Sequence, residues 1–325
     1  MNYSLCKLRF TAPLHAGSGE SAKSLDGSEF TLCADTVFSA LCHTAEADSG
    51  VAAVSELCDL ASSGGLLLSD AMPYCGEELY VPRPLLPPTG YRDTPASERK
   101  LMKALKYLSL NELPDYVSFV CGDGDFSPSG AVRSFGTESA AEKVALKGFD
   151  VSSPYSVGLF SFDADCGLYL LLAAEREETL DHVHRLLVLL GCGGVGGKVS
   201  SGYGKFELAE DPYVFDDVTE EYDQIRLLQR LLCEDFPCYM SVTSSLPNDG
   251  ELDEALMGSF YMVRRRGGFV QSHSFGRAAK KRTQFFLAAG SVFRSRYGGG
   301  LYSVASGEHE VFRYSRPLFL GVDYR

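Results

Sequence analysis

The sequence lacks several features that would place the protein in a membrane or an oxidising compartment. It has no apolar run that could span a bilayer, since its strongest, Leu186–Leu190, is far too short. The N-terminus has no charged segment followed by an apolar one, as a signal peptide would. Ten cysteines are scattered without any Cys-x-x-Cys motif, and a chain of 325 residues needs no disulfide framework. We therefore expect a cytoplasmic protein with reduced thiols and no membrane partner.

Metal and cofactor sites are not indicated either. The closely spaced aspartates lie in polar turns without a converging third ligand (Asp123/Asp125, Asp163/Asp165 and Asp216/Asp217). Solvated turn residues explain them better than a metal site, and no histidine or second cysteine pair lies near Cys233 and Cys238. We expect no metal and no cofactor.

Acidic residues are missing from one long segment, and this absence changes the meaning of the net charge of −13. No aspartate or glutamate occurs from Ala255 to Gly307, and residues 255–325 hold 12 Lys and Arg against three acids. This part therefore carries +9 and residues 1–254 carry −22. Such a split favours a polyanion partner for one face, although two solvated faces of opposite sign are the alternative.

Hydrophobic periodicity indicates an α+β protein with a division near residue 210. Residues 3–10 alternate as a strand, 35–45 form an amphipathic helix that Asp35 caps, and a second helix covers 51–61. Strands at 156–162 and 167–174, a helix at 177–190 and a strand at 205–209 follow. This order predicts a ferredoxin-like domain over residues 1–209. Residues 210–325 form a second, β-rich and basic domain.

Two segments of the first part are predicted to be irregular. Residues 70–100 are rich in proline and glycine, and a helix is expected to begin at Ser97 with Leu101, Leu105 and Leu108 on one face. Residues 121–154 are polar without firm periodicity, and we interpret them as a protruding, mobile insertion.

The glycine-rich segment 191–204 is the most informative part of the sequence. Gly191, Gly193 and Gly196 satisfy G-x-G-x-x-G, but the segment follows a helix and precedes a strand, which is the reverse of a dinucleotide-binding loop. The segment also does not match a Walker nucleotide-binding loop, because Cys192 and Val199 occupy the positions that require glycine and Ser/Thr. A better description is glycine–apolar–glycine, five residues, glycine–apolar–glycine, with Gly194-Val195-Gly196 and Gly202-Tyr203-Gly204 as the two triplets.

Such a segment can bind an anion. Glycines allow close approach of backbone amides to a phosphate, Lys198 adds a charge, and Ser200 and Ser201 add hydroxyl donors. A tight helix-to-strand connection that needs positive φ is the structural alternative, and a binder of small nucleotides is a functional one.

This spacing resembles the signature loop of the RAMP superfamily of CRISPR systems. The segments PLHAGSG, ADTVFSALC, GGKVSSGYGKFEL, YMVRRRGGFVQS and RYSRPLFLGV narrow the resemblance to the fourth Csm subunit of type III-A effector complexes. They lie between residues 8 and 322, so the resemblance covers nearly the whole chain, while 75–150 matches loosely.

The resemblance implies two ferredoxin-like (RRM-like) domains in a non-catalytic RNA-binding subunit. Such a subunit holds the repeat-derived 5′ handle of CRISPR RNA (crRNA) and joins the large polymerase-domain Csm subunit to a backbone RAMP Csm subunit. A projecting hairpin of the family wedges at the junction of handle and spacer. Residues 121–154, with Arg133, Lys143 and Lys147, are the candidate for it here.

The basic stretch independently favours RNA contact. Arginine binds phosphate bidentately, and aromatic side chains stack on splayed bases. The predicted contacts are Arg264, Arg265 and Arg266, which Gly267-Gly268-Phe269 follow, and Arg277, Lys280, Lys281 and Arg282. The alternative is that some of these side chains cover acidic surface of the first domain.

His15 lies in the loop after the first strand, beside Gly17, Ser18 and Gly19. Some RAMP relatives are metal-independent ribonucleases that use a histidine as general acid or base. Cleavage needs a second proton-transfer group, and the other histidines show no helpful spacing. We therefore expect this loop to contact RNA or position the backbone, with no catalytic residue. A RAMP endoribonuclease that processes precursor crRNA remains the alternative.

Overall fold

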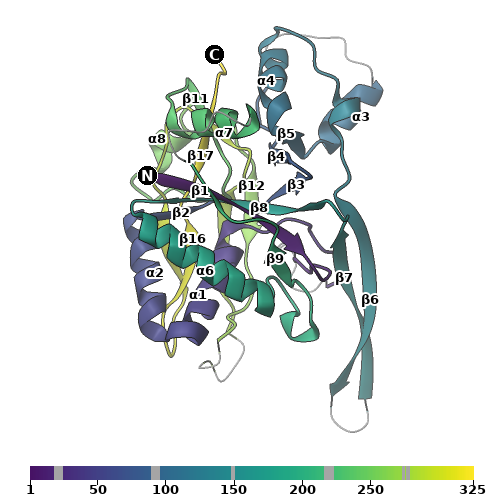
Figure 1. Ribbon diagram of the computed structural model, residues 1–325, viewed down its shortest axis with the longest axis vertical. Helices are drawn as coiled ribbons and strands as arrows, with labels where there is room; N and C mark the ends of the chain where they lie inside the picture. Colours follow the sequence, from purple (N-terminus) through teal and green to yellow (C-terminus); the bar gives the residue numbers. More distant parts are fainter. Residues whose placement is uncertain (18–24, 89–95, 148–150, 216–222, 273–274, 276–278) are drawn as a thin grey trace.

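The structure is a computed structural model that describes residues 1–325 except 18–24, 89–95, 148–150, 216–222, 273–274 and 276–278. Its centre is an antiparallel sheet in the order β10-β1-β8-β3-β4-β5, in which β9 also pairs with β1 and β2 with β8 (Figure 1). The strands are β1 (Asn2–Phe10), β2 (Leu66–Leu68), β3 (Met72–Cys75), β4 (Glu78–Pro82), β5 (Tyr107–Ser109), β8 (Cys166–Ala174), β9 (Phe206–Leu208) and β10 (Tyr213–Val214).

Helices cover both faces of this sheet, which explains why every residue of β8 is buried. On one face, α1 (Ala34–Ser49), α2 (Val51–Ser63) and α6 (Glu177–Gly193) pack against Cys6 and Leu8 of β1. On the other face, Leu5 of β1 packs against side chains of α4 and α7. The alternation predicted for residues 3–10 is thus confirmed. The other helices are α3 (Ala96–Ala104), α4 (Leu113–Cys121), α5 (Pro128–Ala131), α7 (Asp223–Cys233), α8 (Leu252–Leu256) and the 3-10 turns η1 (Leu110–Glu112) and η2 (Val199–Ser201).

The C-terminal part consists of small antiparallel sheets. They are β14-β11-β17 (Val292–Phe293, Cys238–Ser241 and Phe319–Val322), β12-β13 (Val263–Arg266 and Gln284–Leu287) and β15-β16 (Gly300–Ala305 and Val311–Ser315). One hydrophobic cluster joins Met240 and Leu320 of this part to Leu5 and Tyr169 of the central sheet. The fold is therefore mixed α and β with antiparallel sheets, as expected for the α+β class. The division at residues 209/210 stays a prediction.

Two segments predicted to be irregular contain strands. The range 70–100 includes β3 and β4, in which Pro73 precedes the residues that pair with β4 and Pro82 is the last residue of its strand. The helix near Ser97 ends at Ala104, and Leu108 lies in β5 opposite Val81. Leu108 is completely buried there, in the cluster that also holds Val81.

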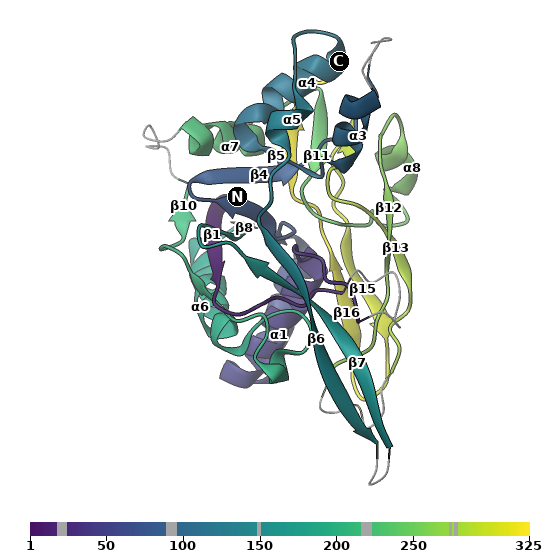
Figure 2. The same ribbon diagram turned by 90° about the vertical axis from the view of Figure 1, so that its right-hand side faces the viewer.

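The predicted insertion at 121–154 contributes to a long hairpin. Strands β6 (Gly136–Lys147) and β7 (Val151–Phe162) pair over their whole length. The hairpin projects from the body of the molecule, as Figures 1 and 2 show, so the prediction of a protruding element is correct. Because most of the described side chains of β6 are solvent-exposed, the strand has no core face, and the periodicity that would have identified it is absent.

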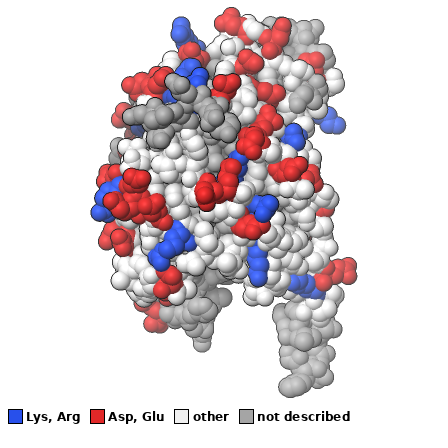
Figure 3. Space-filling model, viewed as in Figure 1, with Lys and Arg blue, Asp and Glu red and all other residues white. Residues whose placement is uncertain are grey.

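Acidic side chains gather over much of the face seen in Figure 3, which has the orientation of Figure 1, and Lys and Arg are scattered among them. Among the described residues, no helix is both long and apolar enough to cross a bilayer.

Candidate nucleic-acid interface

The two glycine triplets of the loop that follows α6 pack against each other. The amide of Val195 donates to the carbonyl of Gly204 (2.9 Å), the amide of Gly204 donates to Pro13, and that of Gly197 donates to His15. Gly196 and Gly204 have φ of 93° and 72°, and a Cβ on Gly204 would lie 1.9 Å from the Val195 oxygen. The tight connection that needs positive φ is therefore present, since the backbone that approaches these glycines closely is the protein's own, and phosphate binding by the loop stays a prediction.

We expect Gly204→Ala to lower the free energy of unfolding by about 2 kcal/mol, because it combines a left-handed φ with a backbone clash. Gly193→Ala is the matched control, since nothing lies within 4 Å of a Cβ there and its φ is not positive. Chemical denaturation of both variants checks this prediction. Equal stability of the two would show that the packing of the triplets does not require glycine.

The glycine loop forms one wall of a cleft of about 1100 Å³ whose other walls come from distant parts of the sequence. One side of α1, along its whole length from Asp35 to Asp48, and the strands and loops around β12 and β13 complete it. Residues predicted to bind RNA meet here from the loop after β1, the glycine loop and the basic stretch. They are His15, Gly17, Gly194, Gly196, Arg265, Arg266, Lys280 and Lys281. Of its lining residues, five are cationic (Arg265, Arg266, Lys280, Lys281, Arg313) and two are acidic (Asp35, Asp48). The cleft is therefore electropositive.

Strand alternation separates the three consecutive arginines of β12. Arg266 is buried and forms a bidentate pair with Asp35 at the start of α1 (2.6 and 3.1 Å), while Arg264 pairs with Glu29. Arg265 is exposed, and its register partner Phe285 is also exposed. The alternative of arginines that cover acidic surface of the first part is thus correct for Arg264 and Arg266. RNA contact by Arg265 stays a prediction.

Asp35 balances a cluster of cations at the edge of the cleft. Burial alone would raise its pKa, but the charge of Arg266 and its hydrogen bond, then Arg313 and Lys281, outweigh burial and lower the pKa. The pKa of Lys281 is lowered by burial and by the charge of Arg313, which Asp35 offsets only partly. Positive charge is therefore in excess beside Lys281, as an anion site requires. Asp35 does not cap α1, because the first helical amide, Ala34, donates to Asp70 (2.8 Å).

Side chains of the glycine loop and of the loop after β1 also contact the middle of the hairpin. His15 is buried, and its Nδ1 donates to the carbonyl of Gly158 in β7 (2.7 Å). Lys198 lies over the ring of Tyr155 (4.9 Å) and Lys143 over Tyr203 (4.6 Å), while Lys143 and Tyr155 are themselves register partners. These four side chains connect hairpin and loop by crossed cation–π contacts.

The other predicted residues that the structure describes do not line the cleft. Ser200 and Ser201 lie in η2, which Gly202 ends, and Arg282 is exposed beside Lys281. Arg133 precedes the hairpin and donates to the sulfur of Cys75. Ser18 and Arg277 lie outside the described residues. Sequence reasoning missed Asp35, Arg313 and Tyr155. Strand alternation through the three arginines could have indicated that Arg265 lies on the opposite face from Arg264 and Arg266.

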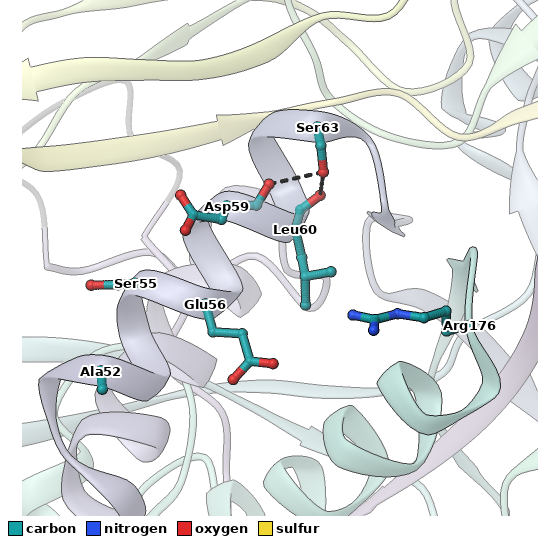
Figure 4. A pocket seen from close by; sticks show the side chains of 7 residues that line it. All are labelled: Ala52, Ser55, Glu56, Asp59, Leu60, Ser63 and Arg176. Carbon is teal, nitrogen blue, oxygen red and sulfur yellow. Dashed lines mark hydrogen bonds between the residues drawn. The ribbon is translucent and has the colours of Figure 1, made fainter.

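A second, shallower hollow of about 680 Å³ lies on α2 (Figure 4). Glu56 and Asp59 line it opposite Arg176, and Ser63 caps the end of the helix through the carbonyls of Asp59 and Leu60. The residues predicted to bind RNA are elsewhere. Two carboxylates against one guanidinium make this hollow a poor site for a polyanion.

Comparisons with known proteins agree with the resemblance. The family described as CRISPR Csm4 C-terminal domain matches residues 234–322. A protein named CRISPR system Cms protein Csm4 from Mycobacterium tuberculosis is 34% identical over 302 residues and 92% of each chain. The protein of the same name from Streptococcus thermophilus is 28% identical over 99% of this chain and 100% of its own.

Solved structures share the fold over the whole chain. A chain of the Csm3–Csm4 subcomplex of the type III-A CRISPR-Cas interference complex matches with a TM-score of 0.64 at 14% identity, covering 99% of this chain and 100% of that one. A chain of the Csm1–Csm4 cassette in complex with AMPPNP gives 0.62 at 19% identity, covering 100% and 99%. With a relative 34% identical along nearly its entire length, this protein belongs to the Csm4 family of CRISPR systems.

Proposed function

We propose that this protein is the RNA-binding subunit of a type III-A CRISPR interference complex and holds the 5′ repeat-derived handle of crRNA in the cleft described above. One observation carries the proposal: segments some 250 residues apart, each expected from sequence to bind RNA, line a single electropositive cleft. The exposed cations Arg265 and Lys280 would bind phosphates, and Phe269, which is 49% exposed at the cleft, offers a ring for base stacking.

The proposed partners are the large polymerase-domain subunit and the first backbone RAMP subunit. Family members occur in Csm1–Csm4 and Csm3–Csm4 structures, and chains of these structures share the fold of this one. We infer that the chain bridges the two partners in the cytoplasm, with its acidic faces turned toward solvent and protein.

The architecture proposed for this role is a pair of ferredoxin-like domains. In the first part, the strand order β9/β10-β1-β8-β2/β3, with α1 and α6 on one face, supports a ferredoxin-like domain. In the second, β11 lies between β14 and β17, and α7 packs on β17, as in a smaller variant of the same motif.

The proposed role is non-catalytic, and the geometry of His15 supports this. Its Nδ1 is engaged by the Gly158 carbonyl and its side chain is buried, so only Nε2 is left for proton transfer. We expect wild-type protein and His15→Ala to leave labelled repeat RNA uncleaved over hours.

Gel analysis of that incubation tests the alternative directly. Cleavage by the wild type that His15→Ala abolishes would establish a RAMP endoribonuclease instead. His15→Ala is also expected to lower stability by about 1 kcal/mol through the lost hydrogen bond, and its binding of intact handle RNA is the control for correct folding.

A further inference from the structure

Two cysteines face each other across neighbouring strands at the base of the hairpin, away from the RNA cleft. Cys75 ends β3, Cys166 begins β8, and the two are register partners. The pair is of the non-hydrogen-bonded type, because such pairs alternate along the ladder and Pro73, two residues earlier, has no amide to donate. The bond from the amide of Gly76 to Asp165 fits the same alternation. Cα atoms of such pairs are about 4.5 Å apart, within the range that a disulfide spans.

The two sulfurs are not equivalent. Arg133 donates from Nη2 to the Cys75 sulfur at 2.9 Å, so a guanidinium lies directly beside this sulfur. Cys166 is 3% exposed, and burial together with its hydrogen bond to Cys75 raises its pKa to about 12. Cys75 is only half-buried and Arg133 is exposed, so an oxidant can reach the Cys75 sulfur. The buried Cys166 stays a protonated thiol beside it.

We propose that Cys75 and Cys166 form a redox-reactive pair in which Cys75 is the nucleophile and Cys166 the resolving thiol, with a peroxide as the oxidant. The Cys75 thiolate attacks hydrogen peroxide, takes one oxygen to become a sulfenic acid, and releases hydroxide, which a proton converts to water. The Cys166 sulfur then attacks the sulfenic sulfur, and its proton leaves with the displaced hydroxyl as a second water. Two thiols and one peroxide thus give one disulfide and two waters.

The chain contains an internal comparison. Cys42 and Cys58, on α1 and α2, also form a sulfur–sulfur hydrogen bond. There the hydrogen bond with Cys42 lowers the pKa of Cys58, against burial and the charge of Asp59, but the two cysteines lie on separate helices and are not opposite each other across paired strands. Because the register holds Cys75 and Cys166 opposite each other, peroxide should form the Cys75–Cys166 disulfide before one between Cys42 and Cys58.

The experiment treats the full-length protein with a small excess of hydrogen peroxide, alkylates the remaining thiols with N-ethylmaleimide and maps the peptides by mass spectrometry. A Cys75–Cys166 disulfide that precedes any other is expected. In Cys166→Ala, Cys75 should stop at the sulfenic acid and be trapped by dimedone. Arg133→Met should slow the reaction about tenfold, and Arg133→Lys should restore part of the rate.

The wild-type map alone can overturn the proposal, so the result does not depend on the folding of a variant. Alkylation of both Cys75 and Cys166 after peroxide treatment would contradict it, as would a Cys42–Cys58 disulfide that forms first. Unchanged reactivity of Cys75 in Arg133→Met would contradict the part assigned to the guanidinium.

Discussion

Replacing Arg265 and Lys280 together by alanine is expected to weaken handle binding about 30-fold at low salt, or by about 2 kcal/mol. Both side chains line the cleft and are exposed to solvent, where a phosphate can reach them. Each lost phosphate contact should also lower the slope of log K against log salt by about 0.7, as for single strands. The double variant should therefore bind with a slope smaller by about 1.4. Filter binding over a salt series measures both quantities.

Lys100→Ala with Lys103→Ala is the matched control for this prediction. It removes the same charge from exposed positions of α3, outside the cleft. We expect its affinity and salt slope to stay within twofold of the wild type. Equal losses in both double variants would mean that total charge, and not the cleft, determines binding.

Asp35→Asn is expected to lower the free energy of unfolding by about 3–5 kcal/mol, the usual cost of removing one partner from a buried ion pair. The side chains of Arg266 and Arg313 are 11% and 3% exposed, so both would lose a buried counter-charge. Asp48→Asn is the control, since its partner Arg185 is 55% exposed and such surface pairs contribute about 0–1 kcal/mol. Similar losses of stability in the two variants would contradict the assignment of Asp35 to a buried ion pair.

The same pair predicts a pH dependence of stability. The folded pKa of Asp35 is lowered, because the charges of Arg266, Arg313 and Lys281 outweigh burial. A carboxylate of this kind stabilises the fold above its unfolded pKa of about 3.9, and the contribution is lost as pH falls through the lower, folded value. The stability difference between wild type and Asp35→Asn should therefore be full at pH 7 and shrink below about pH 4. Urea denaturation at several pH values measures it.

The sequence predicted the elements whose apolar residues have a clear period. The first strand, the helices at α1, α2 and α6 and strand β8 lie where periodicity placed them, because each packs against a core. Strand β6 was missed for the opposite reason, since it has no core face to impose alternation on its side chains, while residues 156–162 of β7 were predicted as a strand. Local pattern also gave too much helix near Leu108, where pairing with Val81 in the sheet decides the structure.

The sequence predicted many of the residues that line the cleft, but not which of them form ion pairs within the protein. Glycine spacing and the acid-free stretch identified two walls of the cleft, because both are visible as runs of residues. Arg266 forms an ion pair with Asp35, which is 231 residues away in the sequence. No local sequence pattern could have predicted this contact. Likewise, the spacing of the glycines does not reveal that Gly204 packs on the backbone of Val195, and phosphate binding by the loop stays a prediction.

Photo-crosslinking tests the central claim most directly. The complex is assembled on crRNA whose 5′ handle carries photoreactive uridines, irradiated and mapped by mass spectrometry. We predict crosslinks on this chain within residues 193–204 and 264–283, the two walls of the cleft. Crosslinks confined to other surfaces, such as α2 or α7, with both walls unmodified, would contradict the assignment of the cleft as the handle site.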